Sequence, residues 1–375
     1  MTGMAVFDDF NDTVLGHHPD FVVGLASAAA ATPAAGPVRM YCPPSYLLHH
    51  RLGRGVTHVA TTGASPGSSA VKLSYSGTVD PKRLAEACLD ARDHGATVFL
   101  NCYFDENYPA WPVSEAGLTY VHSLHRPGYF EADVRRRLGG GGRLVDVVGG
   151  QAPDALFVVN TPVGERQARR FVAPDRLLRV GWPTATRAEV AASFRRGWTP
   201  TDEEPYVLSI GSARSDKGIG VLLTALENGP QLRVLGQQYD GVEERLRSDH
   251  PHARVGFESG WISRTRLAEV IGGAAVIVFP YQQEFAGYGG ASGALAQAIS
   301  AGKPVIVSEV LAEQIPDSPA CQVVPAADGR ALRRAIDDAL RHLPELHEAA
   351  AGLRAYAEEH HTYEGYVRHV LDRCA

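Results

Sequence analysis

The sequence predicts an α/β protein made of two doubly wound, Rossmann-like domains. Short runs of β-branched residues alternate with helical stretches along the chain, which is the signature of parallel β-α units. A length of 375 residues favours two domains, each able to bury a core. The stretch 182–205 is rich in proline, threonine and charge and is the expected linker. Because ligands of such folds bind at the carboxyl ends of the strands, we expect the domains to face each other across a cleft.

Composition excludes several classes of protein. Hydrophobic residues make up 45% of the chain and charged residues 21%, as in ordinary soluble enzymes. The formal net charge of -6 gives no electrostatic case for binding nucleic acid or an anionic membrane. No apolar run approaches the roughly 18 residues of a membrane span. A phosphate site, if there is one, must therefore be a local group of donors.

Cysteine usage and the N-terminus favour a cytoplasmic protein. The five cysteines are scattered and form no Cys-x-x-Cys pair, so neither a disulfide framework nor a zinc site is indicated. Asp8, Asp9 and Asp12 stand where a signal peptide would be basic and then apolar. We expect no metal, because the adjacent histidine pairs lack the spacing of metal ligands; they are His17-His18, His49-His50 and His360-His361.

In the first half of the chain, the clearest helix is Pro81–His94. Its apolar residues Leu84, Ala87, Cys88 and Ala91 recur on one helical face. The strands predicted around it are Ala5–Asp8, Val38–Cys42, Val56–Ala60, Thr97–Cys102, Leu118–His122 and Leu156–Asn160.

The second half of the chain shows the same alternation of predicted strands and helices more regularly. We assign residues 1–185 to an N-terminal domain and 186–355 to a C-terminal domain. The strands predicted for the second half are Tyr206–Ile210, Leu232–Leu235, Ala253–Phe257, Ala275–Phe279, Pro304–Val307 and Gln322–Val324. Its predicted helices are 218–228, 240–248, 263–272, 292–301, 310–315 and 329–342.

The segment 275–308 predicts a strand, a glycine-rich loop, a helix and a second strand. Ser292 is a good N-cap, and Gly289 and Gly290, with Gly293, allow a ligand to approach the backbone closely. The start of such a helix presents free N–H groups and the positive end of its dipole, which suits phosphate. An ordinary, tightly packed α/β helix explains the same residues about equally well.

A second element favours the phosphate site. The predicted strand Tyr206–Ile210 is followed by the turn Gly211–Gly218, which carries Arg214 and Lys217. Each cation alone is better explained as a solvated surface charge. Together, at a strand-to-helix turn in the same domain as the Ser-Gly helix, they suit a diphosphate.

Three glycine patterns carry less weight. Gly63–Gly67 matches a hydrolase nucleophile elbow, but an alternating, strand-like stretch follows where the elbow requires a helix. Gly139–Gly142 is better explained as a loop, because no strand precedes it. Gly218-Ile219-Gly220 lacks the third glycine of a dinucleotide fingerprint, so a dehydrogenase is not favoured.

The second half of the chain resembles the retaining nucleotide-sugar glycosyltransferases of the GT-B fold, the family-4-like group that includes sucrose- and glycogen-synthase-like enzymes. The resemblance covers residues 200–375 and is weaker before them. The motifs that carry it are G-x-x-R-x-x-K-G at Gly211–Gly218, Leu235-Gly236, Val255-Gly256-Phe257 with Gly260-Trp261, and the FPY…SGALAQAISAGKPVIVSE segment.

The resemblance implies a donor site in the C-terminal domain. Arg214 and Lys217 would hold the donor diphosphate. The tail that contains Thr362-Tyr363-Glu364 would form a crossover helix, 356–375, returning to the N-terminal domain. The remaining donor contacts implied are Gly211, the base pocket around Trp261 and Ile262, the loop residues Gly289 and Gly290, and the helix start Ser292-Gly293-Ala294.

The chain departs from the family in one respect. Many members carry two glutamates eight positions apart in this loop. In this register the second, ribose-binding position is Gln297, and the first is Gly289. Glu284 is the nearest acid, but extra loop residues separate it from that register. A glutamine can still bond a ribose hydroxyl, so the contact to the donor sugar is the part left open.

In the first half, the stretch 119–124 resembles the family's strand that ends in a cleft-facing histidine. By that match His122 would contact the donor sugar or stabilise the reacting centre, with His125 as the fallback. A histidine that is simply satisfied at a strand end explains His122 equally well. Gly16 and His17 stand where the family has a glycine loop, although the pattern is poor.

We therefore expect a glycosyltransferase that moves a sugar from a nucleoside-diphosphate sugar to an acceptor hydroxyl. The resemblance implies retention of anomeric configuration, no metal and no cofactor beyond the nucleotide-sugar co-substrate. The acceptor is expected to be a small natural product or a glycan, and the alanine-, glycine- and arginine-rich composition suggests a bacterium. The alternatives are a non-catalytic nucleotide-sugar-binding protein, or a phosphorylase or epimerase on the same fold.

Overall fold

A computed structural model gives the structure of this protein. It describes residues 2–9, 18–32, 35–48, 50–61, 80–108, 117–137, 144–196, 204–238, 240–260 and 262–375. Gly16, His17, Trp261 and the two glycine runs 63–67 and 139–142 lie outside the described residues.

The chain forms two compact units, and each contains segments that are far apart in the sequence. Unit 1 comprises Met1–Thr186, Tyr288–Ala291 and Thr362–Ala375. Unit 2 comprises Arg187–Gly287 and Ser292–His361. The sequence interpretation placed 288–291 in the C-terminal domain, whereas the structure packs this short loop into unit 1.

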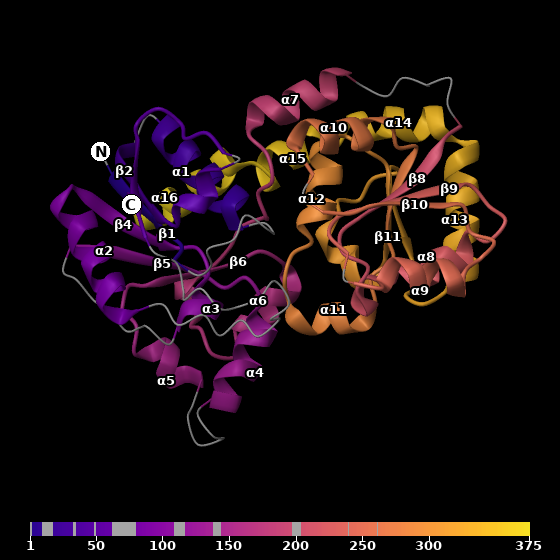
Figure 1. The fold of residues 1–375 in the computed structure, drawn as a ribbon. Helices are drawn as coiled ribbons and strands as arrows, with labels where there is room; N and C mark the ends of the chain where they lie inside the picture. The colour runs from indigo at the N-terminus through magenta and orange to yellow at the C-terminus, as the bar shows by residue number, and fades with distance from the viewer. Residues whose placement is uncertain are drawn as a thin grey trace. The chain divides into compact units, whose positions relative to one another are not determined.

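The sheet of unit 1 has, among the described residues, the strand order β3-β2-β1-β4-β5-β6-β7 (Figure 1), and its strand pairs are parallel. Central strands such as β1 are almost wholly buried, which explains their continuous apolar runs. The strands are β1 Thr2–Phe7, β2 Ala35–Cys42, β3 Val56–Ala60, β4 Ala96–Asn101, β5 Thr119–Ser123, β6 Leu156–Val159 and β7 Leu177–Arg179.

The helices of unit 1 cover both faces of this sheet. The predicted helix at 81–94 is confirmed as α2, which buries the expected face of Leu84, Ala87, Cys88 and Ala91 and is capped by Asp80. The helices are α1 His18–Ala31, α2 Pro81–Asp93, α3 Phe104–Asn107, α4 Pro127–Arg137, α5 Leu144–Gly149, α6 Pro162–Ala168 and α16 Tyr363–Cys374, with 3₁₀ helices η1 Pro44–Leu47 and η3 Pro174–Arg176.

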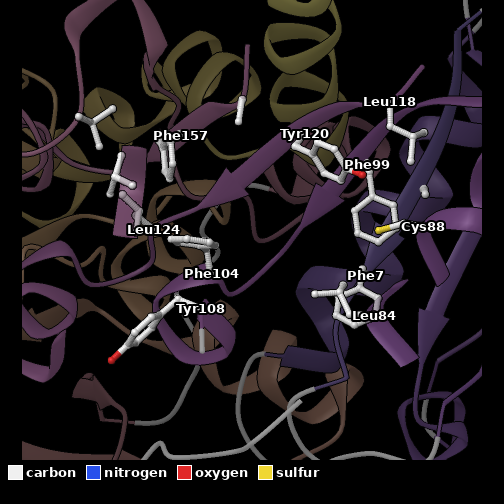
Figure 2. Packing of buried hydrophobic residues seen from close by; sticks show 14 of the residues in the cluster. Phe7, Leu84, Cys88, Phe99, Phe104, Tyr108, Leu118, Tyr120, Leu124 and Phe157 are labelled. Atoms are coloured by element: carbon white, nitrogen blue, oxygen red, sulfur yellow. The ribbon is translucent and has the colours of Figure 1, made fainter. Parts of the chain in front are cut away.

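One face of the sheet carries an aromatic core (Figure 2). Phe7, Phe99 and Tyr120 come from neighbouring strands, and the ring centroids of Phe7 and Phe99 are 5.6 Å apart. Helices α2, α3, α4, α5 and α6 contribute further buried side chains to this cluster, among them Phe104 of α3. In Figure 1, α1 and α16 lie on the other side of the sheet from α4 and α5.

The C-terminal helix α16 packs directly on α1. Tyr366 meets the ring of Phe21 edge-on at 5.6 Å, and Phe21 stacks on Trp182 at 4.4 Å. The backbone of Gly24 lies so close to Tyr363 that a Cβ atom there would overlap the tyrosine ring. The single crossover helix expected at 356–375 is instead divided between two helices, α15 and α16. Thr362 lies between them and caps α16, because its hydroxyl accepts the N–H of Gly365.

Unit 2 has a second parallel sheet, with the strand order β10-β9-β8-β11-β12-β13 among the described residues. The six strands predicted for this half are all present, with ends shifted by two residues at most. They are β8 Tyr206–Ile210, β9 Gln231–Leu235, β10 Val255–Glu258, β11 Val276–Phe279, β12 Val305–Ser308 and β13 Cys321–Val324.

Three helices of unit 2, α7, α11 and α14, were not expected from the sequence. The predicted linker contains α7, because Val190 and Phe194 form one apolar stripe; Val190 is fully buried, and Phe194 packs on Gly302. The glycine-rich loop contains the short helix α11. The helices are α7 Arg187–Arg196, α8 Ile219–Ala225, α9 Val242–Asp249, α10 Arg264–Gly273, α11 Gln283–Tyr288, α12 Gly293–Ser300, α13 Gly329–Arg341, α14 Leu343–Ala351 and α15 Arg354–His360, with 3₁₀ helices η4 Ser215–Lys217 and η5 Glu309–Gln314.

The contact between α1 and α16 gives a test of the packing of unit 1. Replacing Gly24 by alanine should lower the free energy of unfolding by about 1–3 kcal/mol, because the added methyl group collides with the buried ring of Tyr363. Gly149→Ala is the matched control in a helix of the same unit, where no atom lies within 4 Å of the added Cβ. Urea unfolding followed by circular dichroism measures both; equal stability of the two variants would contradict the packing described.

Candidate functional site

The candidate site of unit 2 forms where the carboxyl ends of the neighbouring strands β8 and β11 meet the start of α12. The turn after β8 touches the residues that follow β11. The N–H of Gln282 donates to the carbonyl of Asp216 at 2.9 Å. Gly218 has a φ of 67°, and a Cβ atom there would overlap the carbonyl oxygen of Pro280. Only glycine fits this approach of two backbones.

Arg214 and Asp216 form an ion pair within this turn. The guanidinium of Arg214 donates from Nε to Oδ1 of Asp216 at 2.9 Å and from Nη2 to Oδ2 at 2.6 Å. Asp216 is 6% exposed, whereas the side chain of Arg214 is 31% exposed. The carboxylate therefore orients the arginine from the protein side, and the exposed part of the guanidinium can meet an anion.

The ammonium of Lys217 lies over two aromatic rings. Its Nζ is 3.7 Å from the ring centroid of Tyr281 and 4.1 Å from that of Phe285. The pKa of Lys217 is lowered to about 7, mainly by burial and also by the charge of Arg214, while Asp216 opposes the shift. The ring faces offset part of the lost hydration. A diphosphate placed beside Lys217 would favour its charged form.

The start of α12 has the capping predicted from the sequence. The Oγ of Ser292 accepts the N–H of Leu295 at 3.3 Å, and the carbonyl of Ser292 accepts the N–H of Ala296. The N–H groups of Gly293 and Ala294 precede the first helical hydrogen bond and point out of the helix. Both residues are half-buried, so these two N–H groups are the ones left to meet an anion.

The remaining predicted donor residues occupy several positions in unit 2. Gln297 is half-buried one turn beyond Gly293, on the same side of α12. Gly211 has a φ of 125° and lies at the end of β8, and Ile262 is half-buried before α10. Glu284 is exposed on α11. The contacts of these residues with a donor stay predictions.

Gly289 and Gly290 pack within unit 1. Thr161 donates its hydroxyl to the carbonyl of Gly289 at 2.7 Å, and a Cβ added at Gly164 would lie 2.6 Å from that same oxygen. A Cβ added at Gly290 would lie 3.1 Å from the carbonyl oxygen of His125. Close packing within unit 1 therefore explains why glycine occupies both positions. That a ligand approaches them stays a prediction.

The two candidate histidines of unit 1 differ in their surroundings. His122 is 1% exposed, with its ring centroid 4.4 Å from Phe104 and 5.2 Å from Phe157. Its pKa is lowered to about 3, mainly by burial and also by the charge of Arg176, so the ring is neutral at physiological pH. His125 follows β5, and its ring lies against Trp182 at 4.5 Å. His125 is 8% exposed and adjoins Gly290 through its backbone carbonyl, and the contact of either histidine with a ligand stays a prediction.

Sequence reasoning missed three residues that shape these sites. Tyr281 was part of a quoted motif, but no role was assigned to it. Gln238 accepts the N–H of Ala213 at 2.6 Å and so holds the turn after β8. Asp105 accepts the N–H groups of His125 and Arg126, both at 3.0 Å. For Asp105 a signal was present, since it is a polar residue that follows a buried strand.

Neither a metal centre nor a membrane span is found in the described part of the chain. No group of three or more His, Cys, Asp or Glu side chains in these ranges is arranged to hold a metal ion. None of the helices described is both long enough and apolar enough to cross a bilayer.

Comparison with known proteins identifies the fold. Residues 204–342 match the family model described as Glycosyl transferases group 1. A sucrose-phosphate synthase from Thermosynechococcus elongatus superposes with a TM-score of 0.71 at 20% sequence identity, covering 99% of this chain and 98% of that chain. The chain has the GT-B fold.

Two further structures with this fold are similar over their whole length. HepE from Anabaena, in complex with UDP and glucose, has a TM-score of 0.63 at 12% identity, covering 100% of this chain and 99% of that chain. AviGT4, a glycosyltransferase involved in avilamycin A biosynthesis, has a TM-score of 0.62 at 14% identity, covering 99% of this chain and 96% of that chain. No curated protein sequence matches this chain. The resemblance to GT-B glycosyltransferases inferred from the motifs is confirmed.

The contact between Gly218 and Pro280 can be tested by adding one methyl group. Gly218→Ala should lower the free energy of unfolding by about 1–2 kcal/mol for the left-handed backbone and about 1–3 kcal/mol more for the collision. Gly241→Ala is the control, because its φ is 73° and no atom lies within 4 Å of the added Cβ. If denaturant unfolding shows the same loss for both variants, the close approach is not a constraint.

Proposed function

We propose that this protein is a glycosyltransferase that moves a sugar from a nucleoside-diphosphate sugar to an acceptor hydroxyl. The observation that carries the proposal is the meeting of Arg214, Lys217 and the start of α12 in unit 2, inside the region that matches glycosyl transferases group 1. Two cations and a helix N-terminus are the groups that bind a diphosphate in proteins. The structures of HepE in complex with UDP and with UDP-glucose support the same class of donor.

The chemistry follows from where charge develops. The bond between the sugar's anomeric carbon and the diphosphate oxygen breaks, and negative charge grows on the departing diphosphate. Arg214, Lys217 and the N–H groups of Gly293 and Ala294 would stabilise that charge more strongly in the transition state than in the ground state. These groups are fixed in advance by the ion pair with Asp216, by the aromatic rings and by the helix cap.

We further propose that the sugar keeps its anomeric configuration. The acceptor oxygen would attack from the face that the diphosphate leaves, forming the new bond to the anomeric carbon. The departing phosphate oxygen would take the proton of the acceptor hydroxyl, so no side-chain nucleophile is required. With Arg214 and Lys217 as counter-charges, the reaction needs no divalent cation in this proposal. His125, beside Gly290 in unit 1, is the candidate contact for the sugar.

We also propose a bacterial, cytoplasmic enzyme acting on a small natural product or a glycan. The structure describes all five cysteines and joins none of them in a disulfide. Free thiols suit a reducing compartment. The avilamycin glycosyltransferase among the similar structures supports natural-product chemistry as one acceptor class.

Removing both cations tests the proposed function. The donor is first chosen by thermal shift with UDP, GDP, ADP and dTDP sugars, because a bound ligand raises the unfolding temperature. Replacing Arg214 and Lys217 together by alanine should lower kcat/KM for that donor about 10²–10³-fold, because the diphosphate loses two charge-assisted partners. Arg254→Ala is the matched control, since Arg254 pairs with Glu204 on the exposed surface of the same unit. Unchanged kcat/KM and affinity in the double variant would overturn the proposal. It would also be overturned if none of the four nucleotide sugars raised the unfolding temperature.

The affinity for the donor should depend on pH through Lys217. Its pKa of about 7 in the free protein should rise when a diphosphate binds, so binding takes up a proton above that pH. Affinity should therefore fall as the pH rises from about 7 to about 9, by at most about tenfold per unit. Lys217→Arg stays charged throughout and should flatten this dependence. Calorimetric titration with the nucleotide sugar measures both; a flat wild-type profile would contradict the prediction.

A further inference from the structure

Tyr281 touches two of the groups that the proposed function assigns to the diphosphate. It lies two residues beyond the end of β11 and is 2% exposed. The face of its ring lies under Nζ of Lys217 at 3.7 Å. Its hydroxyl lies 3.0 Å from the Oγ of Ser292, the cap of α12. A single side chain therefore spans the gap between the cation and the helix start.

The backbone of Tyr281 is held on two sides. The hydroxyl of Ser308, at the end of β12, donates to the carbonyl of Tyr281 at 2.6 Å. The next residue, Gln282, donates its N–H to the carbonyl of Asp216 in the turn that carries Lys217. Phe285 meets the tyrosine ring edge-on, with the centroids 4.7 Å apart. These contacts leave the ring and its hydroxyl little freedom to move.

The hydroxyl of Tyr281 is the part that packing alone does not explain. Phenylalanine would fill the same volume without a buried polar atom, and burying a hydroxyl costs free energy unless it is hydrogen-bonded. Its partner, the Oγ of Ser292, already accepts the N–H of Leu295. The bond to Tyr281 therefore restrains the serine rotamer that caps α12, next to the outward N–H groups of Gly293 and Ala294.

We propose that Tyr281 is a positioning residue that holds Lys217 and the start of α12 in the arrangement that a diphosphate requires. The ring orients the lysine ammonium, and the hydroxyl orients Ser292. The inference rests on the proposed donor and adds to it the residue that couples its two anion-binding groups. Tyr281 acts through these groups rather than by touching the sugar.

Tyr206 offers a close control in the same unit. It is 4% exposed, its hydroxyl donates to the carbonyl of Val270 at 2.6 Å, and the guanidinium of Arg233 lies 4.0 Å from its ring centroid. It thus has a buried hydrogen bond and a cation over the ring, but at the opposite end of β8 from the site. Tyr206→Phe should reproduce the loss of one buried hydrogen bond without affecting donor affinity.

The hydroxyl is tested by a double-mutant cycle on donor affinity. Tyr281→Phe should weaken binding of the nucleotide sugar about threefold to tenfold, as expected for one lost hydrogen bond, and Tyr206→Phe less than about twofold. Ser292→Ala should also weaken binding, and the double variant with Tyr281→Phe should be no weaker than Ser292→Ala alone. Additive losses, or equal losses in Tyr281→Phe and Tyr206→Phe, would overturn the role of the hydroxyl.

The ring is tested without any donor, so that the result does not depend on the proposed function. The chain has only four lysines, Lys72, Lys82, Lys217 and Lys303, so the side-chain NMR signals of isotope-labelled lysine can be resolved and assigned with Lys217→Arg. Tyr281→Leu should raise the titration midpoint of Lys217 from about 7 by about one unit or more, because water replaces the ring beside Arg214, Asp216 and the ammonium. Tyr281→Phe should change the titration midpoint of Lys217 by no more than a few tenths of a pH unit.

Lys303 provides the internal reference for this titration. It is 3% exposed, and its Nζ donates to the carbonyls of Gly272 and Ala274, away from Tyr281. Its midpoint should stay constant in all variants. An unchanged Lys217 midpoint in folded Tyr281→Leu would overturn the role of the ring. A chain that binds no nucleotide sugar, but shows the expected Lys217 shift, would contradict the proposed function and leave the ring contact established.

Discussion

The backbone of Gly218 lies against the carbonyl of Pro280, and the candidate site of unit 2 depends on that approach. It brings the turn after β8 to the residues after β11 without any side chain between them. Lys217 can then place its ammonium over Tyr281, and Tyr281 can reach the cap of α12. Any larger residue at 218 would separate the cation from the helix start, although neither group is part of the contact itself.

The site combines positive charge with enclosure, two properties that oppose each other. Enclosing Lys217 between aromatic rings lowers its pKa, so the free protein holds the ammonium at a cost in free energy. The ion pair of Arg214 with Asp216 likewise neutralises part of the arginine's charge inside the protein. In the proposed function, a bound diphosphate would supply the negative charge that favours the charged form of Lys217, beside the donors that the fold has already placed there.

Much of the fold could be predicted from the sequence, because local patterns determine local structure. The spacing of Leu84 and Cys88 identified α2, and short apolar runs identified the six described strands of unit 2. The cap at Ser292 and the cations of the Gly211–Gly218 turn were readable from residue type and position. Helix α7 was not predicted because the proline-, threonine- and charge-rich composition indicated a linker, although its two large apolar residues, Val190 and Phe194, have helical spacing.

The contacts that could not be predicted join residues far apart in the chain. Nothing near Gly289 in the sequence shows that the hydroxyl of Thr161, 128 positions earlier, donates to its carbonyl in unit 1. This topology has a consequence for synthesis on the ribosome. Unit 1 needs α16, whose Tyr363 packs on Gly24, so its assembly cannot finish until the segments of unit 2, which precede Thr362, have been translated. Unit 1 is thus begun before unit 2 but completed after it, and the surface of α1 that α16 will cover must remain soluble while unit 2 is made.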